Sequence, residues 1–412
     1  MRIRTLLVTL WRNKTGPLLV SAQVAITLAL IVNVAYVVEQ RIAEISKPTG
    51  LDVDNIFWLQ VKASSKDYPY ANAVKADLDY LNSLSGVVAA TTTNNVPETN
   101  SITGLPFAPT LESLQKGIEH FGAQIVFGTD KYIAAMGLKL IAGRTFDPGA
   151  IKPPAADWNA ALGNWADEVI VTQSFAKRLF PDGNALGKPI YVGLINKSST
   201  IVGIVELLRT PPEVEVYDYF ATQIVIAPII PAGPNVNYVV RARPGQRDRL
   251  MAQIEKSFAD FQPGRYIAHM EDLTHTAENA RRELKANATI LAVVAVLVVV
   301  VTIVGISGLA AFNVSTRTKQ LGVRRAIGAR KSHILRYFLV ENWIITTCGA
   351  AVGSLLALTA GVKLSTMYEM SRAPLYYLVG GIVLMWTIGL LAVLVPARRA
   401  ASISPAVATR AI

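Results

Sequence analysis

Apolar and polar stretches alternate on a large scale along this chain. Four apolar runs reach the length of about 20 residues that a helix needs to cross a bilayer. They cover residues 16–38, 288–312, 338–362 and 375–395. Residues 39–287 contain no run of that kind and mix polar with apolar positions. We therefore expect four transmembrane helices, with one large soluble domain between the first and the second.

Within residues 39–287, the apolar period predicts a strand, a helix and a second strand, and it does so twice. The first set covers residues 55–61, 70–83 and 87–93, and the second covers residues 237–243, 247–261 and 265–270. Two such units flanking an insert predict an α+β domain: a split ferredoxin-like fold with a β-rich insert at about residues 115–230. Two unrelated α/β pieces are the alternative that the pattern leaves open.

The net charge of +11 is concentrated beside the apolar runs. Residues 1–15, 313–337 and 396–412 together hold 14 Lys and Arg residues and no Asp or Glu, whereas the rest of the chain holds 26 basic and 29 acidic residues. Basic segments next to spans stay in the cytoplasm and attract anionic lipid. We therefore expect both termini and residues 313–337 in the cytoplasm, and residues 39–287 and the loop 363–374 outside. Membrane lipids, not nucleic acid, are the expected partner of these basic groups.

The first apolar run is predicted to be an uncleaved membrane anchor. Residues 1–15 mix four cations with apolar side chains and predict a short amphipathic helix along the inner leaflet. The run of 23 residues that follows is longer than the roughly 7–15 apolar residues of a signal peptide, and no small-residue cleavage site comes after it.

The segment Arg317–Arg330, between the second and third runs, carries five basic side chains and no acidic one. Leu321, Ile327 and Ile334 recur near helical spacing, and Gly328 marks a break between two helices. The pattern predicts an amphipathic helix that presents apolar and cationic groups at the membrane surface. A loop that only sets the topology is the alternative, since basic loops are general among membrane proteins.

The order of residues in this segment resembles the signature of the FtsX-like permease family, the MacB-like branch of ABC exporters, which is of the kind R-x-K-E-I-G-I-R-R-A-L-G-A. Gln320 stands where a glutamate is usual, so any salt bridge of that carboxylate is missing here. In that family the segment is a coupling helix that sits in a groove of a separate ATPase. The resemblance therefore implies ATPase-coupling roles for Arg317, Lys319, Gln320, Leu321, Gly322, Arg324, Arg325, Ile327 and Gly328.

Other parts of the chain resemble the same family. Residues 128–146 and 169–205 are similar to the extracytoplasmic core of MacB-like permeases. Residues 396–405 resemble the terminal segment P-A-R-R-A-A-x-x-x-P, and residues 406–410 lack the glutamate that the family tends to carry after it. Leu-Trp-Arg-Asn-Lys at residues 10–14 also resembles the start of MacB-like permeases. The resemblance therefore covers the first span, the soluble domain and the last three spans.

The resemblance implies a permease subunit of an ABC-type exporter in the bacterial inner membrane. ATP and Mg²⁺ would bind to a separate cytoplasmic ABC ATPase. The second span would pass the motion of that ATPase to the extracytoplasmic domain by mechanotransmission, which would expel a peptide, an antibiotic or another amphiphile. A second permease, as a homodimer or a sister chain, is an implied partner, as are a periplasmic adaptor and an outer-membrane channel in a Gram-negative cell. The alternatives are a cargo-free mechanical regulator of an extracytoplasmic enzyme or sensor, and a lipoprotein-releasing permease.

Motifs for chemistry on this chain are few. The segment Gly183–Pro189 resembles a phosphate loop, but it has three residues between its glycines and a proline after the lysine, where that loop needs four residues and a Ser or Thr. Cys348 lies in an apolar run, and the histidines have no metal-ligand spacing. We therefore expect no catalytic, cofactor or metal site on this chain. A membrane-anchored enzyme is the weaker alternative.

Two expectations concern the ends of the spans. Arg281–Lys285 leads into the second apolar run and predicts one continuous helix there. Glu341 lies near the inner end of the third run, where a carboxylate needs a partner. We expect that partner to be Arg336 or Arg398.

Overall fold

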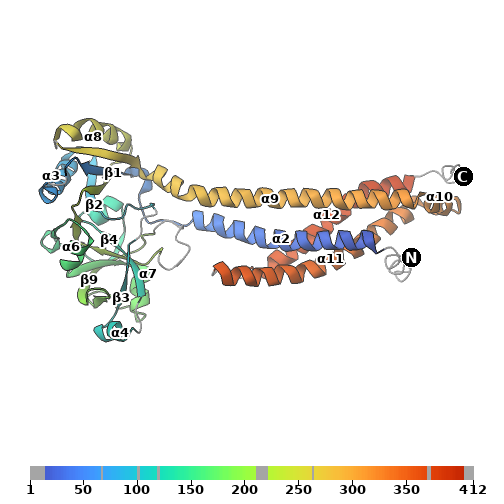
Figure 1. Cartoon of the computed structure of the whole chain (residues 1–412), viewed down its shortest axis with the longest axis horizontal. Helices are drawn as coiled ribbons and strands as arrows, with labels where there is room; N and C mark the ends of the chain where they lie inside the picture. The colour runs from blue at the N-terminus through green and yellow to red at the C-terminus, as the bar shows by residue number, and fades with distance from the viewer. Residues whose placement is uncertain are drawn as a thin grey trace. The chain divides into compact units, whose positions relative to one another are not determined.

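The computed structural model describes residues 14–65, 68–99, 103–117, 121–209, 221–261, 264–368 and 373–402. It divides into two compact units. One is an interspan domain, residues 45–284, and the other is a membrane unit, residues 1–44 and 285–412. Figure 1 labels many of the elements of both. The amphipathic helix predicted at residues 1–15 lies almost wholly outside the described residues, as does the end of the tail.

The first sheet of the interspan domain is antiparallel, with the strand order β13-β1-β12-β2. Its strands are β1 (Ile56–Ala63), β2 (Val87–Thr93), β12 (Asn235–Ala242) and β13 (Arg265–Asp272). Helix α3 (Tyr70–Ser83) connects β1 to β2, and helix α8 (Arg247–Phe261) connects β12 to β13. Both predicted strand–helix–strand units thus share one sheet in the split ferredoxin-like order. The alternative of two unrelated α/β pieces is wrong.

The two faces of this sheet bury different side chains because successive strand residues point to opposite sides. Phe57, Leu59 and Val61 of β1 pack with residues of α3 and α8 in one apolar cluster. Ile56 of β1 and Val239 of β12 pack on the other face, in a cluster with residues of the insert. The sheet is therefore covered by helices on one side and by the insert on the other.

The insert folds as a seven-stranded sheet with the order β5-β9-β7-β10-β4-β3-β8, in which β8 also pairs with β9. Six of these strands therefore close into a ring, with β5 at its edge. The strands are β3 (Gly104–Ala108), β4 (Phe121–Phe127), β5 (Leu140–Gly143), β7 (Glu168–Thr172), β8 (Pro189–Val192), β9 (Lys197–Val205) and β10 (Ile224–Ala227). Because β3 belongs to this sheet, the insert begins before residue 115, where the sequence pattern places its start.

Short elements complete the interspan domain. A small parallel sheet joins β6 (Lys152–Ala155) to β11 (Ile229–Pro231). The short helices are α4 (Leu111–Lys116), α5 (Tyr132–Met136), α6 (Trp158–Gly163) and α7 (Gln173–Leu179), with 3-10 turns η1 (Val53–Asn55) and η2 (Pro148–Ala150). Helix α7 lies after β7 and contributes Phe175 to the apolar interior of the ring.

Four helices in the described part of the chain are long and apolar enough to cross a membrane. They are α2 (Thr15–Ile45), α9 (Leu273–Thr316), α11 (Lys331–Tyr368) and α12 (Leu375–Ser402), and their membrane-unit parts run alongside one another (Figure 1). Helix α9 includes Arg281–Lys285, so the continuous helix predicted there is present. Helix α12 continues through Pro396, which neighbouring helices make tolerable in a membrane helix.

The packing of α2 against α11 depends on small residues. A Cβ on Gly349 would lie 2.7 Å from the carbonyl oxygen of Ser21, and one on Gly353 would lie 2.8 Å from that of Ala25. The hydroxyls of Thr27 and Thr302 are 2.8 Å apart, so α2 also contacts α9 through a buried hydrogen bond. Close backbone approach and interhelical hydrogen bonds are how helices associate in lipid.

Candidate functional site

The basic segment forms helix α10 (Thr318–Ala326), between α9 and α11. One side of this helix is fixed to the membrane unit. Leu321 is buried in the same apolar cluster as Ile334 and Phe338 of α11, and Gly322 beside it is also buried. The buried side of α10, formed by Leu321 and Gly322 and here called its base, therefore packs against the first turns of α11.

Arg317 occupies the position before α10 and is held by a carboxylate. Its Nη1 donates to both carboxylate oxygens of Glu341, at 3.1 and 3.3 Å. The expectation that Glu341 pairs with Arg336 or Arg398 is therefore wrong. Arg336 lies five residues before Glu341 on one helix, which turns its side chain about 140° away. The short turn between α9 and α10 instead brings Arg317 onto the carboxylate.

Gly328 ends this part of the chain in a left-handed conformation, with a φ of 97°. Its N–H donates to the carbonyl of Arg325 at 3.1 Å, and the N–H of Ala329 donates to the carbonyl of Arg324 at 3.0 Å. These two bonds form a Schellman motif, which satisfies carbonyls at the end of α10. The side chain that glycine lacks would meet no atom within 4 Å, so the backbone conformation alone requires glycine here. The predicted break between two helices is confirmed.

The side of α10 that points away from the apolar cluster carries five exposed side chains, which we call the docking face: Lys319, Gln320, Val323, Arg324 and Ile327. Val323 is 53% exposed and Ile327 is 82% exposed. Helical spacing brings positions 320, 323, 324 and 327 onto one stripe. Two apolar side chains thus stand in solvent-accessible positions between two cations.

Ile327 differs from the expectation drawn from its spacing. Leu321 and Ile334 are buried, as a shared apolar face requires, but Ile327 is not. The reason is that Ile327 lies six residues after Leu321, which turns it about 120° away from the buried side and onto the stripe of positions 320, 323 and 324. Ile327 therefore belongs to the docking face and not to the base.

Arg324 and Arg325 are neighbours with different surroundings. Arg324 is exposed, and its guanidinium carbon lies 5.7 Å from the ring centroid of Tyr337. Arg325 is half-buried, and its Nη1 donates to the carbonyl of Ala401 at 3.3 Å. Arg325 thus joins α10 to the end of α12, whereas Arg324 is accessible on the docking face.

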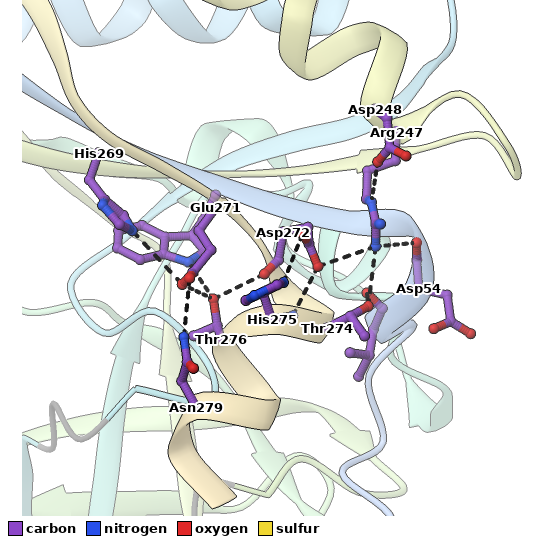
Figure 2. A network of polar contacts seen from close by, with 12 residues as sticks. Asp54, Arg247, Asp248, His269, Glu271, Asp272, Thr274, His275, Thr276 and Asn279 are labelled. Carbon is purple, nitrogen blue, oxygen red and sulfur yellow. Dashed lines mark hydrogen bonds and ion pairs between the residues drawn. The ribbon is translucent and has the colours of Figure 1, made fainter. Parts of the chain in front are cut away.

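A second candidate site lies within the interspan domain, at the junction of β13 with the start of α9, and Figure 2 shows its polar contacts. Asp272 ends β13 and caps α9, because its Oδ1 accepts the N–H of His275 at 2.9 Å. The hydroxyl of Thr276 accepts the indole N–H of Trp58 at 2.9 Å and donates to Glu271 at 2.7 Å. The sheet therefore continues into the helix without an intervening loop.

Arg247 extends this junction to a third element (Figure 2). As the first residue of α8, it donates to the carbonyl of Asp54 at 3.0 Å and to the hydroxyl of Thr274 at 3.1 Å. Its Nη1 also lies 3.5 Å from a carboxylate oxygen of Asp272. The start of α9 is thus bound to β1, β13 and α8 together.

Glu98, which follows β2, places a buried carboxylate against a later turn of α9. Its side chain is 1% exposed, its φ is 62°, and one carboxylate oxygen lies 3.1 Å from Nη2 of Arg281. Burial raises the pKa of Glu98, and the charges of Arg281 and Arg209 act in the opposite direction. A residue with a positive φ that is not glycine is uncommon, so the surrounding structure holds Glu98 against this helix.

Sequence reasoning identified the basic segment but missed the junction at α9. Asp272 does carry a signal, since it stands directly before a helical run as a helix-capping residue does. Glu98 carries none, because its burial and backbone conformation come from tertiary structure. Within the described residues, no group of three His, Cys, Asp or Glu side chains is arranged to hold a metal ion.

Comparison with known proteins gives two family matches. A family model described as "MacB-like periplasmic core domain" matches residues 22–257, and one described as "FtsX-like permease C-terminal" matches residues 292–405. The second match includes α10 and the docking face. The first match includes Arg247 and Glu98, whereas the start of α9 at Leu273 and its cap Asp272 lie between the two matched ranges.

Curated relatives show the same likeness. A "Macrolide export ATP-binding/permease protein MacB" of Agrobacterium fabrum is 27% identical over 76% of this chain and 46% of its own length. The protein of that name from Chromobacterium violaceum is 26% identical over 66% of this chain and 41% of its own length. This chain thus spans less than half the length of these relatives. The crystal structure of the periplasmic region of MacB from Actinobacillus actinomycetemcomitans covers 57% of this chain, with 12% identity and a TM-score of 0.34, and 96% of that chain is covered.

Proposed function

This chain belongs to the family of MacB-like permeases, because the model of that family's periplasmic core domain matches more than half of its residues. From this premise we propose that it is the permease subunit of an ABC-type exporter, driven by an ABC ATPase on a separate polypeptide. ATP and Mg²⁺ bind to that ATPase and not to this chain. In this proposal the four apolar helices cross the bacterial inner membrane, with both termini and α10 in the cytoplasm and the interspan domain outside.

The docking face of α10 is the observation that carries this proposal. Apolar side chains at an exposed helix surface gain about 25 cal/mol for each Å² that a partner covers. Val323 and Ile327 offer such area, and Lys319 and Arg324 add cations on either side. The base of α10 is fixed by Leu321, by the Arg317–Glu341 pair and by the Gly328 turn, so that a partner's push is passed on rather than absorbed. The proposed partner surface is an apolar groove with acidic residues at its rim.

We propose that motion travels from α10 through the membrane unit to α9 and then to the interspan domain. Helix α9 is continuous from Leu273 to Thr316, and its first turn is capped by Asp272 and bound by Arg247. A helix that enters a sheet without a loop passes on displacement with little loss. A second permease, identical or a sister chain, completes the transport unit in this proposal, and a periplasmic adaptor and an outer-membrane channel receive the cargo. The cargo class proposed is a peptide, an antibiotic or another amphiphile.

The test is co-purification of an ATPase with variants of the docking face. The chain would be tagged, extracted under mild conditions and examined for a P-loop ATPase that accompanies it. The variants are Ile327→Glu and the pair Lys319→Glu with Arg324→Glu. Because these side chains are exposed, the substitutions leave the permease fold intact. We expect the ATPase with the wild-type chain and at least a tenfold loss with either variant, which corresponds to about 1.4 kcal/mol.

Arg399→Glu is the matched control. Arg399 is an exposed arginine near the end of α12, so its substitution reverses one positive charge, as each member of the docking-face pair does, on a different helix. Retention of the ATPase by this variant excludes a general charge effect. If no ATPase accompanies the wild-type chain with or without nucleotide, the exporter proposal is wrong. Retention by the docking-face variants would instead move the contact to another surface.

A cargo-free mechanical regulator would pass this test as well, so cargo needs its own measurement. Transport activity of the permease–ATPase complex in cells would be compared between wild type and the docking-face variants. Parallel loss of ATPase binding and of cargo release is the result expected for an exporter. Loss of ATPase binding that leaves cargo release unchanged favours the regulator.

A further inference from the structure

A crevice between the two lobes of the interspan domain has the lining of a ligand site. It encloses about 360 Å³, within the range of about 300–1,000 Å³ that small-molecule sites occupy. One wall comes from the ferredoxin-like sheet and the other from the insert. The lining includes Asn94, Asn95, Asn235 and Asn237 on the first wall and Asp157 and Trp158 on the second.

This lining is rich in amides, and it holds one carboxyl group and no cationic side chain. It includes the four asparagines Asn94, Asn95, Asn235 and Asn237, and among the lining residues Asp157 is the one with an ionisable side chain. A site without a cation does not select an anionic ligand. An amide presents both a donor and an acceptor, and a hydroxyl of the ligand can satisfy both kinds of group. The lining therefore suits a neutral ligand that carries several hydroxyls.

Two of the asparagines are held in place by backbone groups. Asn94 donates to the carbonyl of Ile125 at 3.2 Å and accepts the N–H of Phe127 at 2.7 Å. Asn95 is 6% exposed, donates to the same carbonyl at 3.2 Å and accepts the hydroxyl of Thr103 at 3.4 Å. Side chains fixed in this way lose little entropy when a ligand binds. This wall of the crevice is therefore built before any ligand arrives.

The opposite wall combines an aromatic ring with a carboxylate. The indole of Trp158 is half-buried and stacks on Phe127, with ring centroids 5.6 Å apart and an interplanar angle of 25°. Asp157 uses one oxygen to accept the N–H of Ala160 at 2.8 Å, which orients its carboxylate. A flat aromatic ring beside amides and a carboxylate matches a sugar ring, whose faces carry C–H groups and whose rim carries hydroxyls.

We propose that this crevice binds a neutral carbohydrate, with the sugar ring against Trp158 and its hydroxyls bonded to Asp157 and the asparagine amides. The inference goes beyond the proposed function and does not rest on it, since sugar binding requires neither an ATPase nor transport. A neutral peptide fits less well, because Pro231 and Pro234 in the lining have no N–H to donate to a peptide backbone.

The test uses the full chain in lipid nanodiscs, since detergents with sugar headgroups would compete for the site. Saturation-transfer NMR would be recorded with cellobiose, maltose and N,N′-diacetylchitobiose, and with a neutral blocked tripeptide. We expect binding of at least one disaccharide and none of the tripeptide. Asn235→Ala removes an exposed amide and is expected to weaken binding about tenfold. Trp158→Phe keeps an aromatic ring against Phe127 and is expected to weaken it several-fold.

Asn159→Ala is the matched control, because Asn159 is exposed on α6, the helix of Trp158, and does not line the crevice. It is expected to bind as the wild type does, and all variants should share one apparent melting temperature. Absence of binding by every disaccharide at millimolar concentration overturns the proposal. So does disaccharide binding that is unchanged in both Asn235→Ala and Trp158→Phe. Binding of the tripeptide in place of the sugars would assign the crevice to peptides.

Discussion

At the scale of single residues, the basic segment separates into side chains that hold α10 and side chains that it displays. Arg317, Leu321 and Arg325 contact other helices of the membrane unit, whereas Lys319 and Ile327 are exposed. The sequence motif alone does not separate these two groups of side chains, because neighbouring positions such as Arg324 and Arg325 have different surroundings. Substitutions at the two classes should therefore have different effects, stability for the first and partner binding for the second.

Removal of Arg317 should destabilise the membrane unit. The side chain of Glu341 is 8% exposed, so Arg317→Ala leaves its carboxylate buried without its partner, which typically costs about 3–5 kcal/mol. The double variant Arg317→Gln with Glu341→Gln removes both charges and should recover most of that loss. The apparent melting temperature in nanodiscs measures both. A double variant no more stable than Arg317→Ala would show that the pair is not what holds α10.

Gly328→Ala should loosen the end of α10 without creating a clash. Its φ of 97° lies where alanine is disfavoured by about 1–2 kcal/mol. The expected result is faster amide hydrogen exchange at residues 324–329, where the Schellman bonds lie. Gly308→Ala is the control, since a Cβ there also meets no atom within 4 Å but the backbone is helical. Equal exchange in both variants and the wild type would contradict a conformational role for Gly328.

At the scale of elements, sequence reasoning worked where one constraint dominates. The spans follow from the need to cover about 30 Å of hydrocarbon, and the strand–helix–strand units follow from local apolar period. The closed ring of the insert could not be predicted in the same way. It depends on parallel pairs such as β7 with β9 and β4 with β10, and these pairings join strands that local pattern does not connect.

The junction of β13 with α9 was likewise not predicted, because the sequence pattern extends the helix of the second span back only to Arg281 and α9 begins earlier. The apolar run of the second span starts at residue 288, but α9 starts at Leu273. The residues between them are polar and amphipathic, and their helical state is supported by Asp272 and by contacts from Trp58 and Arg247. A helix that is stabilised by its cap and by tertiary contacts has a weaker sequence signal than a helix that is apolar throughout because it spans a membrane.

Substitutions of Asp272 should separate capping from charge at this junction. Asp272→Asn keeps a side-chain oxygen for the N–H of His275 and removes the charge that faces Arg247. Asp272→Ala removes both and should cost about 1 kcal/mol more. Amide hydrogen exchange in the first turn of α9 is the measurement, with faster exchange expected in the alanine variant alone. Similar acceleration in both variants would mean that the Arg247 contact, and not the cap, fixes the helix.

At the scale of the whole molecule, two buried carboxylates make the stability of the interspan domain depend on pH. Burial raises the pKa of Asp77. The hydrogen bond from Tyr238 and the charge and hydrogen bond of Arg265 lower it, but burial is the larger effect. Glu98 follows the same pattern against Arg281 and Arg209. Each group therefore has a higher pKa in the folded domain than in the unfolded chain. Neither was predictable from sequence, since burial of a carboxylate depends on which cations the fold brings to it.

The sign of the pH dependence follows from these shifts. Between the ordinary pKa of about 4.5 and the raised value, the folded chain binds more protons at Glu98 than the unfolded chain does. The free energy of unfolding that this group contributes must therefore fall as pH rises through that window, and it stays constant above the raised pKa. The ion pair with Arg281 reduces the fall but does not reverse it, because burial is the larger effect.

Glu98→Gln removes this titration and should change the pH profile in one direction. The stability of the variant relative to the wild type should rise with pH across the window and then level off. The measurement is hydrogen exchange of the interspan domain in the full chain, with variant and wild type compared at the same pH. The pH would run from about 4 to 8, which spans the expected window. Glu112→Gln is the control, because Glu112 is an exposed carboxylate in a surface pair with Lys116. A difference that falls with rising pH would mean that the Arg281 pair outweighs burial, and Glu98 would then act as a stabilising partner of α9 rather than as a charge held there at a cost.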